Sequence, residues 1–177
     1  MLTYILFTLV VGSVYALLAQ SLMLSWGTAG LVNLGLAGFF AVGAYASSML
    51  TTWEHAPIML GVFVAVLAGG VAGLLVCFST LRLRDDYLAI VTLGFAEIVR
   101  IVASNEVWLT GGTDGISGVP VMIARDTGIW FHLGTLLITL AAVAVVYLLQ
   151  RRLLSSPWGR AMRAIREDQT VASVTER

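Results

Sequence analysis

Charged residues are scarce in this 177-residue chain, at 11% of the total, while apolar residues reach 59%. Soluble domains carry roughly 25% charged residues, so a chain of this composition could not cover its surface with polar groups in water. The scarcity argues against a soluble enzyme, a nucleic-acid-binding protein and a disordered protein. The chain also has a single cysteine, which excludes an intrachain disulfide and a cysteine-based metal cluster.

Charge is absent altogether from residues 1–53. A bilayer core about 30 Å thick is crossed by about 20 apolar helical residues, so this stretch is long enough to cross twice. The apolar runs predict about five spanning helices, at residues 3–24, 31–52, 58–79, 87–103 and 130–149. We therefore expect an all-α fold, a polytopic transmembrane helix bundle, with a transmembrane domain over 1–150 and a cytoplasmic segment over 151–177.

Lysine is absent, so the ten basic residues are all arginines, and their placement is uneven. Arg82 and Arg84 lie between the third and fourth predicted spans, and six more arginines follow the fifth. With five spans these two regions lie on the same side of the membrane, and only Arg125 lies clearly on the other side. Cytoplasmic segments are enriched in arginine, which predicts a cytoplasmic C-terminus and an N-terminus outside.

The fourth predicted span carries two charged residues, Glu97 and Arg100, three positions apart and therefore on neighbouring faces of one helix. Glu97 lies about 15 Å along the span, near the bilayer midplane, where an ionised group needs a partner or water. Two interpretations remain open. The pair belongs to a substrate or proton site, or it is an internal ion pair that fixes the orientation of the helix.

Glycine is frequent in the second predicted span, between residues 30 and 45. Broken or closely packed helices of this kind can line a substrate path, and the alternative is ordinary helix packing. The candidates for lining a translocation path are Asn33, Gly35, Gly38, Tyr45, Glu97 and Arg100.

Small residues also recur at every fourth position of the third predicted span, at Gly61, Ala65, Gly69 and Gly73. Such a repeat lets two helix backbones approach closely. It is typical of generic bundle packing, and it also fits a helix that must sit tightly beside a substrate path.

A glycine-rich loop follows the fourth predicted span on the outer side. Its candidate residues are Gly111, Gly112, Thr113, Asp114, Gly115 and Gly118. The glycine spacing resembles that of a phosphate-binding loop. However, no Gly-Lys-Ser/Thr sequence follows, and the loop is predicted outside the cell membrane, whereas ATP is cytoplasmic. The glycines allow a positive φ at several points. We expect the loop to line a substrate entrance, to meet an external partner or simply to connect two spans.

A short amphipathic helix is predicted after the fifth span, because Ser156 suits a helix N-cap and Pro157 the first helical position. Apolar residues then follow at i, i+3, i+4 and i+7 and form one stripe: Trp158, Ala161, Met162 and Ile165. Two hypotheses remain open. The helix docks into a groove of a cytoplasmic partner, or it lies on anionic lipid.

Four segments, in this order, resemble the permease subunits of branched-chain amino acid ABC transporters: residues 30–45, 81–100, 110–120 and 156–168. The resemblance implies that the last segment couples the chain to an ATPase. The residues matching this coupling segment are Trp158, Gly159, Arg160, Met162, Ile165, Arg166 and Glu167. It also implies that residues 110–120 lie near a solute-binding protein.

The resemblance further implies the function and the partners. The chain would be the permease subunit of an importer for branched-chain amino acids, or for a related small polar solute such as urea, in the bacterial inner membrane. Its partners would be a second permease subunit, two cytoplasmic ATPase subunits, a periplasmic solute-binding protein and membrane lipid, without nucleic acid. It would not itself be an enzyme and would need no cofactor or metal, since ATP hydrolysis belongs to the ATPase subunits.

Two departures from the family pattern stand out. Leu36 occupies a position where the family often has histidine, and the resemblance fades after Asp168, where family members continue with further spans. This predicts a chain cut short by a truncation, a frameshift or an incomplete gene, and it leaves open whether the chain itself can transport. Two further hypotheses are a small membrane interaction protein that transports nothing and a secondary carrier that uses Glu97.

Overall fold

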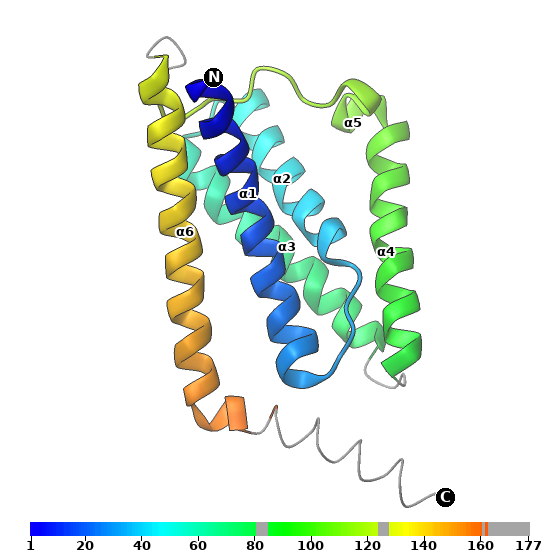
Figure 1. Ribbon diagram of the computed structural model, residues 1–177. Helices are drawn as coiled ribbons and strands as arrows, with labels where there is room; N and C mark the ends of the chain where they lie inside the picture. The colour runs from blue at the N-terminus through cyan, green and yellow to red at the C-terminus, as the bar shows by residue number, and fades with distance from the viewer. Residues whose placement is uncertain (81–84, 124–127, 161, 163–177) are drawn as a thin grey trace, which may run out of the picture. The chain divides into compact units, whose positions relative to one another are not determined.

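The computed structural model describes residues 1–80, 85–123, 128–160 and 162 (Figure 1). Within these residues every regular element is a helix. In chain order they are α1 (Leu2–Leu22), the π-helix η1 (Met23–Thr28), α2 (Leu36–Trp53), α3 (Ile58–Thr80), α4 (Asp85–Asn105), α5 (Val107–Thr110), the 3-10 helix η2 (Gly112–Asp114) and α6 (Ile129–Ser155). The all-α prediction is confirmed.

Four helical stretches are long and apolar enough to cross a membrane: Leu2–Thr28, Ile58–Thr80, Tyr87–Asn105 and Ile129–Ser155. These agree with four of the predicted spans, and they support the prediction of a polytopic transmembrane helix bundle. The predicted loop arginines Arg82, Arg84 and Arg125 lie outside the described residues, and the orientation in the membrane stays a prediction.

The second predicted span differs from the prediction. The helix α2 begins at Leu36 rather than at residue 31 and has 18 residues, and it is not among the four stretches. Residues 30–35 are not helical, and Gly30 has a φ of 76°, which strongly favours glycine. The backbone therefore leaves the helical path after η1 and resumes it six residues later.

The helices form two compact units. Unit 1 consists of the described residues within Met1–Val32 and Ile123–Arg177, and unit 2 of those within Asn33–Met122. In unit 1, α1 and α6 pack against each other. The Gln150 amide nitrogen donates to the Gln20 carbonyl at 3.0 Å, and the Gln20 amide nitrogen donates to the Val143 carbonyl at 3.4 Å. The Gln20 and Gln150 side chains thus link α1 and α6 by hydrogen bonds to backbone carbonyls.

In unit 2, α2 packs against both α3 and α4. The small-residue repeat of α3 faces α2: a Cβ built on Gly61 would lie 2.6 Å from the Thr51 methyl carbon. A Cβ on Gly43 of α2 would lie 3.1 Å from the Ala65 carbonyl oxygen, whereas one on Gly73 would have no neighbour within 4 Å. The prediction of close helix packing is confirmed along the first part of the repeat and fails at Gly73.

Candidate functional site

A cavity of about 380 Å³ lies between α2 and α4 in unit 2. Its lining consists mainly of small or apolar residues around one ion pair: Ala37, Gly38, Ala41, Tyr45, Leu93, Ala96, Glu97, Arg100, Ala103 and Ser104. The structure thus brings together four of the six predicted path residues, namely Gly38 and Tyr45 from α2 and Glu97 and Arg100 from α4. We call this space the α2–α4 cavity.

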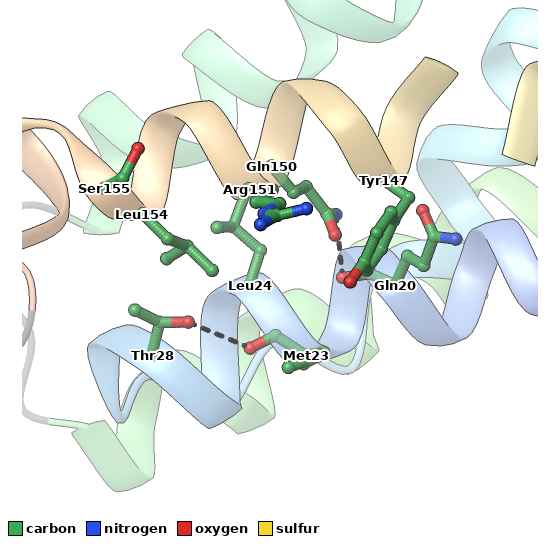
Figure 2. Close-up of a pocket in the computed structure, with 9 residues that line it drawn as sticks. All are labelled: Gln20, Met23, Leu24, Thr28, Tyr147, Gln150, Arg151, Leu154 and Ser155. Atoms are coloured by element: carbon green, nitrogen blue, oxygen red, sulfur yellow. Dashed lines mark hydrogen bonds between the residues drawn. The ribbon is translucent and has the colours of Figure 1, made fainter. Parts of the chain in front are cut away.

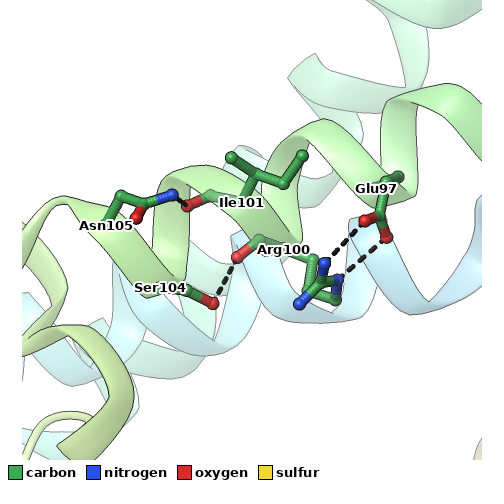
Figure 3. A network of polar contacts seen from close by, with 5 residues as sticks. All are labelled: Glu97, Arg100, Ile101, Ser104 and Asn105. Carbon is green, nitrogen blue, oxygen red and sulfur yellow. Dashed lines mark hydrogen bonds and ion pairs between the residues drawn. The ribbon is translucent and has the colours of Figure 1, made fainter.

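The charged groups of the α2–α4 cavity are Glu97 and Arg100, which form a bidentate ion pair along one side of α4 (Figure 3). Arg100 donates from Nη2 to Glu97 Oε1 at 2.6 Å and from Nε to Glu97 Oε2 at 2.9 Å. Such a fork fixes the geometry of both groups. The Arg100 side chain is nevertheless 66% exposed and that of Glu97 52% exposed, so the described residues leave a large part of each group uncovered.

The depth of this pair follows from the helix geometry. Glu97 lies ten residues after Tyr87, the first residue of a candidate span. At about 1.5 Å per residue this places it about 15 Å along a bilayer core about 30 Å thick. Charged groups at that depth face protein, water or a solute rather than lipid.

The predicted path residues Asn33 and Gly35 do not line this cavity. Instead they shape the start of α2: the Asn33 side-chain oxygen accepts from the Gly35 N–H at 2.9 Å. A Cβ on Gly35 would lie 2.8 Å from the Thr92 carbonyl oxygen, so the missing side chain lets α2 start directly against α4. A role for these two residues in the path stays a prediction.

Thr92 is the residue that sequence analysis missed. It is 1% exposed, its hydroxyl donates to the Leu88 carbonyl at 2.9 Å, and the same oxygen accepts from the Leu34 N–H at 3.0 Å. A threonine inside an apolar span commonly bonds to its own helix, which is all that the sequence indicates. Its second bond satisfies a backbone donor in the irregular segment before α2, which lies 58 residues earlier.

Gly38 allows α2 to lie close to α4 beside the cavity. A Cβ at this position would lie 2.8 Å from Ala96 Cα and 3.0 Å from a ring carbon of Phe95. The neighbouring rings of Phe39 and Phe95 have their centroids 4.8 Å apart. The absence of a side chain at Gly38 therefore fixes the spacing of the two helices that form the cavity.

The predicted outer loop follows α5 directly and folds into a turn that packs against α4. Gly111, Gly112, Gly115 and Gly118 all have a positive φ, between 62° and 79°, as expected from the glycine spacing. The buried Thr110 hydroxyl donates to the Ala103 carbonyl at 2.7 Å and accepts from the Gly112 N–H at 3.2 Å.

The polar side chains of this turn point outward. Thr113 and Asp114 lie in η2, and both are exposed. The turn therefore offers a short polar surface on a constrained backbone, and its contact with an external partner stays a prediction.

The predicted amphipathic helix is described only at its start. Residues 157–160 are helical, Ser156 is extended, and the Arg160 N–H donates to the Ser156 carbonyl at 3.3 Å. This confirms the predicted helix start. Trp158 is 74% exposed, and Arg160 is exposed as well.

The other residues of the coupling segment differ in their surroundings. Gly159 is buried, and a Cβ there would lie 2.6 Å from the Leu154 carbonyl carbon, while Met162 is partly buried. The predicted coupling residues Ile165, Arg166 and Glu167 lie outside the described residues.

A second cavity, of about 400 Å³, lies between α1, η1 and α6 of unit 1 (Figure 2). Its lining mixes apolar and polar side chains: Gln20, Met23, Leu24, Thr28, Tyr147, Gln150, Arg151, Leu154 and Ser155. The Thr28 hydroxyl donates to the Met23 carbonyl at 3.3 Å. None of the predicted path residues contributes to this lining.

The chain resembles known transport proteins along almost its whole length. A family model described as the permease component of the branched-chain amino acid transport system matches residues 4–175. The high-affinity branched-chain amino acid transport system permease protein LivM of Escherichia coli is 37% identical over 183 residues, covering 88% of this chain and 42% of the relative. The protein of the same name from Salmonella typhimurium gives the same values.

A more distant relative comes from an archaeon. The probable branched-chain amino acid transport permease protein LivM of Methanocaldococcus jannaschii is 28% identical over 188 residues, covering 88% of this chain and 54% of the relative. The chain thus spans between 42% and 54% of the length of these curated relatives. No solved structure matches it.

Proposed function

Because the chain belongs to the family of permease components of branched-chain amino acid transport systems, we propose that it forms part of the membrane path of an ABC importer for branched-chain amino acids. It is a multi-pass inner-membrane protein and a transport component rather than an enzyme. The observation that carries the proposal is the match over residues 4–175. The α2–α4 cavity supports it, because it holds an ion pair near the middle of a candidate span.

The proposed partners are the other subunits of such importers. The chain pairs with a second permease subunit, two ATPase subunits bind on the cytoplasmic side, and a periplasmic solute-binding protein delivers the amino acid. The polar turn with Thr113 and Asp114 suits contact with the solute-binding protein, since both side chains are exposed. The exposed Trp158 suits contact with an ATPase, since large aromatic side chains commonly anchor interfaces.

Uptake by the reconstituted complex tests this function. The chain, a second permease subunit and the ATPase subunits are incorporated into proteoliposomes with the solute-binding protein, and accumulation of radiolabelled leucine is measured. We expect accumulation that requires ATP and the solute-binding protein. Uptake driven by an ion gradient without ATP would support a secondary carrier instead, and no uptake by the complete complex would contradict the proposal.

The coupling segment allows a sharper prediction. Ile165→Asp places a carboxylate in the apolar stripe of the predicted helix and should uncouple ATP hydrolysis from uptake, because a charge in a docked apolar face is unfavourable. The ratio of leucine transported to ATP hydrolysed is expected to fall about tenfold.

Ala164→Asp is the matched control, because it adds the same charge about 100° around that helix from Ile165, beside the apolar stripe rather than within it. It should keep a normal ratio. Equal ratios in the two variants would contradict docking through the stripe.

A further inference from the structure

We propose that the Glu97–Arg100 pair binds the zwitterionic head of an α-amino acid in the α2–α4 cavity, with Glu97 accepting from the ammonium group and Arg100 donating to the carboxylate. The inference rests on the proposed transport function and names the residues that recognise the head of its substrate. It makes these two residues specificity determinants of the path.

The hydrogen-bonding capacity of the pair fits such a ligand. A guanidinium carries five N–H donors, and Arg100 uses two of them on Glu97, which leaves three for a second carboxylate. A carboxylate has about four acceptor positions, so Glu97 also keeps capacity for an ammonium group. Positive and negative groups lie side by side, as the two ends of an amino acid head require.

The arrangement argues against a purely structural pair. Both residues belong to α4, and the α2 residues that line the cavity are Ala37, Gly38, Ala41 and Tyr45, none of which is charged. The pair therefore does not bridge two helices. Exposed ion pairs contribute little to stability, and charges at this depth are unfavourable in lipid, so packing alone does not account for two half-exposed ionic groups here.

The rest of the cavity suits an apolar side chain. Alanines and Leu93 surround the ion pair, and the volume of about 380 Å³ lies at the small end of the range of about 300–1,000 Å³ for small-molecule sites. A neutral solute such as urea could hydrogen-bond to both groups but carries no charges to match them. The lining thus favours an amino acid with an apolar side chain.

Binding of tritiated leucine to the assembled transporter, without its solute-binding protein, tests the inference. Unlabelled leucinamide lacks the carboxylate and 4-methylpentanoate lacks the amino group. We expect each to compete about tenfold less well than leucine, because each loses charge-assisted hydrogen bonds. Equal competition by unlabelled leucine, leucinamide and 4-methylpentanoate would overturn the inference. This test uses the wild-type complex and needs no variant.

Two variants add a signature that a structural role would not produce. Arg100→Gln should weaken leucine binding about tenfold and remove the preference for leucine over leucinamide, while keeping the preference over 4-methylpentanoate. Glu97→Gln should show the reverse pattern.

The matched control is Glu106→Gln, since Glu106 lies outside the cavity and accepts from the Trp108 indole N–H at 2.7 Å. It should bind leucine as the wild type does. Unchanged leucine binding in both cavity variants would overturn the inference. Absence of ATP-driven uptake by the wild-type complex would instead count against the proposed function.

Discussion

Replacing Gly38 with valine is expected to separate α2 from α4 and to abolish most of the transport activity. A Cβ at this position would lie 2.8 Å from a backbone atom, Ala96 Cα, and a backbone atom cannot rotate away as a flexible side chain can. Overpacking of this kind costs about 1–3 kcal/mol. The α2–α4 cavity would lose its shape, so uptake should fall at least about tenfold.

The measurement is thermal stability in detergent by fluorescence-detected size exclusion, together with leucine uptake. Gly94→Val is the matched control, because a Cβ on Gly94 of α4 has no neighbour within 4 Å. It should leave both quantities near their wild-type values. A Gly38→Val protein as stable and active as the Gly94→Val protein would contradict the close approach of the two helices.

Thr92→Val is expected to produce the other large effect. Valine keeps the shape of threonine but removes the hydroxyl oxygen that accepts from the Leu34 N–H at 3.0 Å. Leu34 itself is 46% exposed, so the loss of this hydrogen bond should cost about 0.5–1.5 kcal/mol. The irregular segment before α2 should loosen.

Thr92→Ser is the informative comparison, because serine keeps the oxygen and loses only a methyl group. We expect a melting temperature close to wild type for Thr92→Ser and a clearly lower one for Thr92→Val. The opposite order would mean that Thr92 acts by packing and not as a hydrogen-bond acceptor.

Long apolar runs made the helices α1, α3 and α6 predictable from sequence, since the bilayer sets both their length and their composition. The ion pair of Glu97 and Arg100 was also predictable, because residues three apart on a helix are neighbours. Both features depend on local sequence alone.

The start of α2 and the α2–α4 cavity were not predictable in the same way. The helix begins late because the Leu34 N–H bonds to Thr92 and the Gly35 N–H bonds to the Asn33 side chain, and the first of these contacts joins distant parts of the chain. The glycines marked this region as unusual. They did not indicate that Gly38 and Tyr45 face Glu97 and Arg100 across one cavity.

The roles proposed for the polar turn and the coupling segment require that they lie on opposite sides of the membrane. The single native cysteine, Cys77, is replaced by serine, and one cysteine is introduced at either Ser117 or Ser173. Intact cells are treated with a membrane-impermeant maleimide. We expect the maleimide to label Ser117→Cys in intact cells. It should label Ser173→Cys only after the inner membrane is permeabilised. Labelling of Ser173→Cys in intact cells would contradict the account.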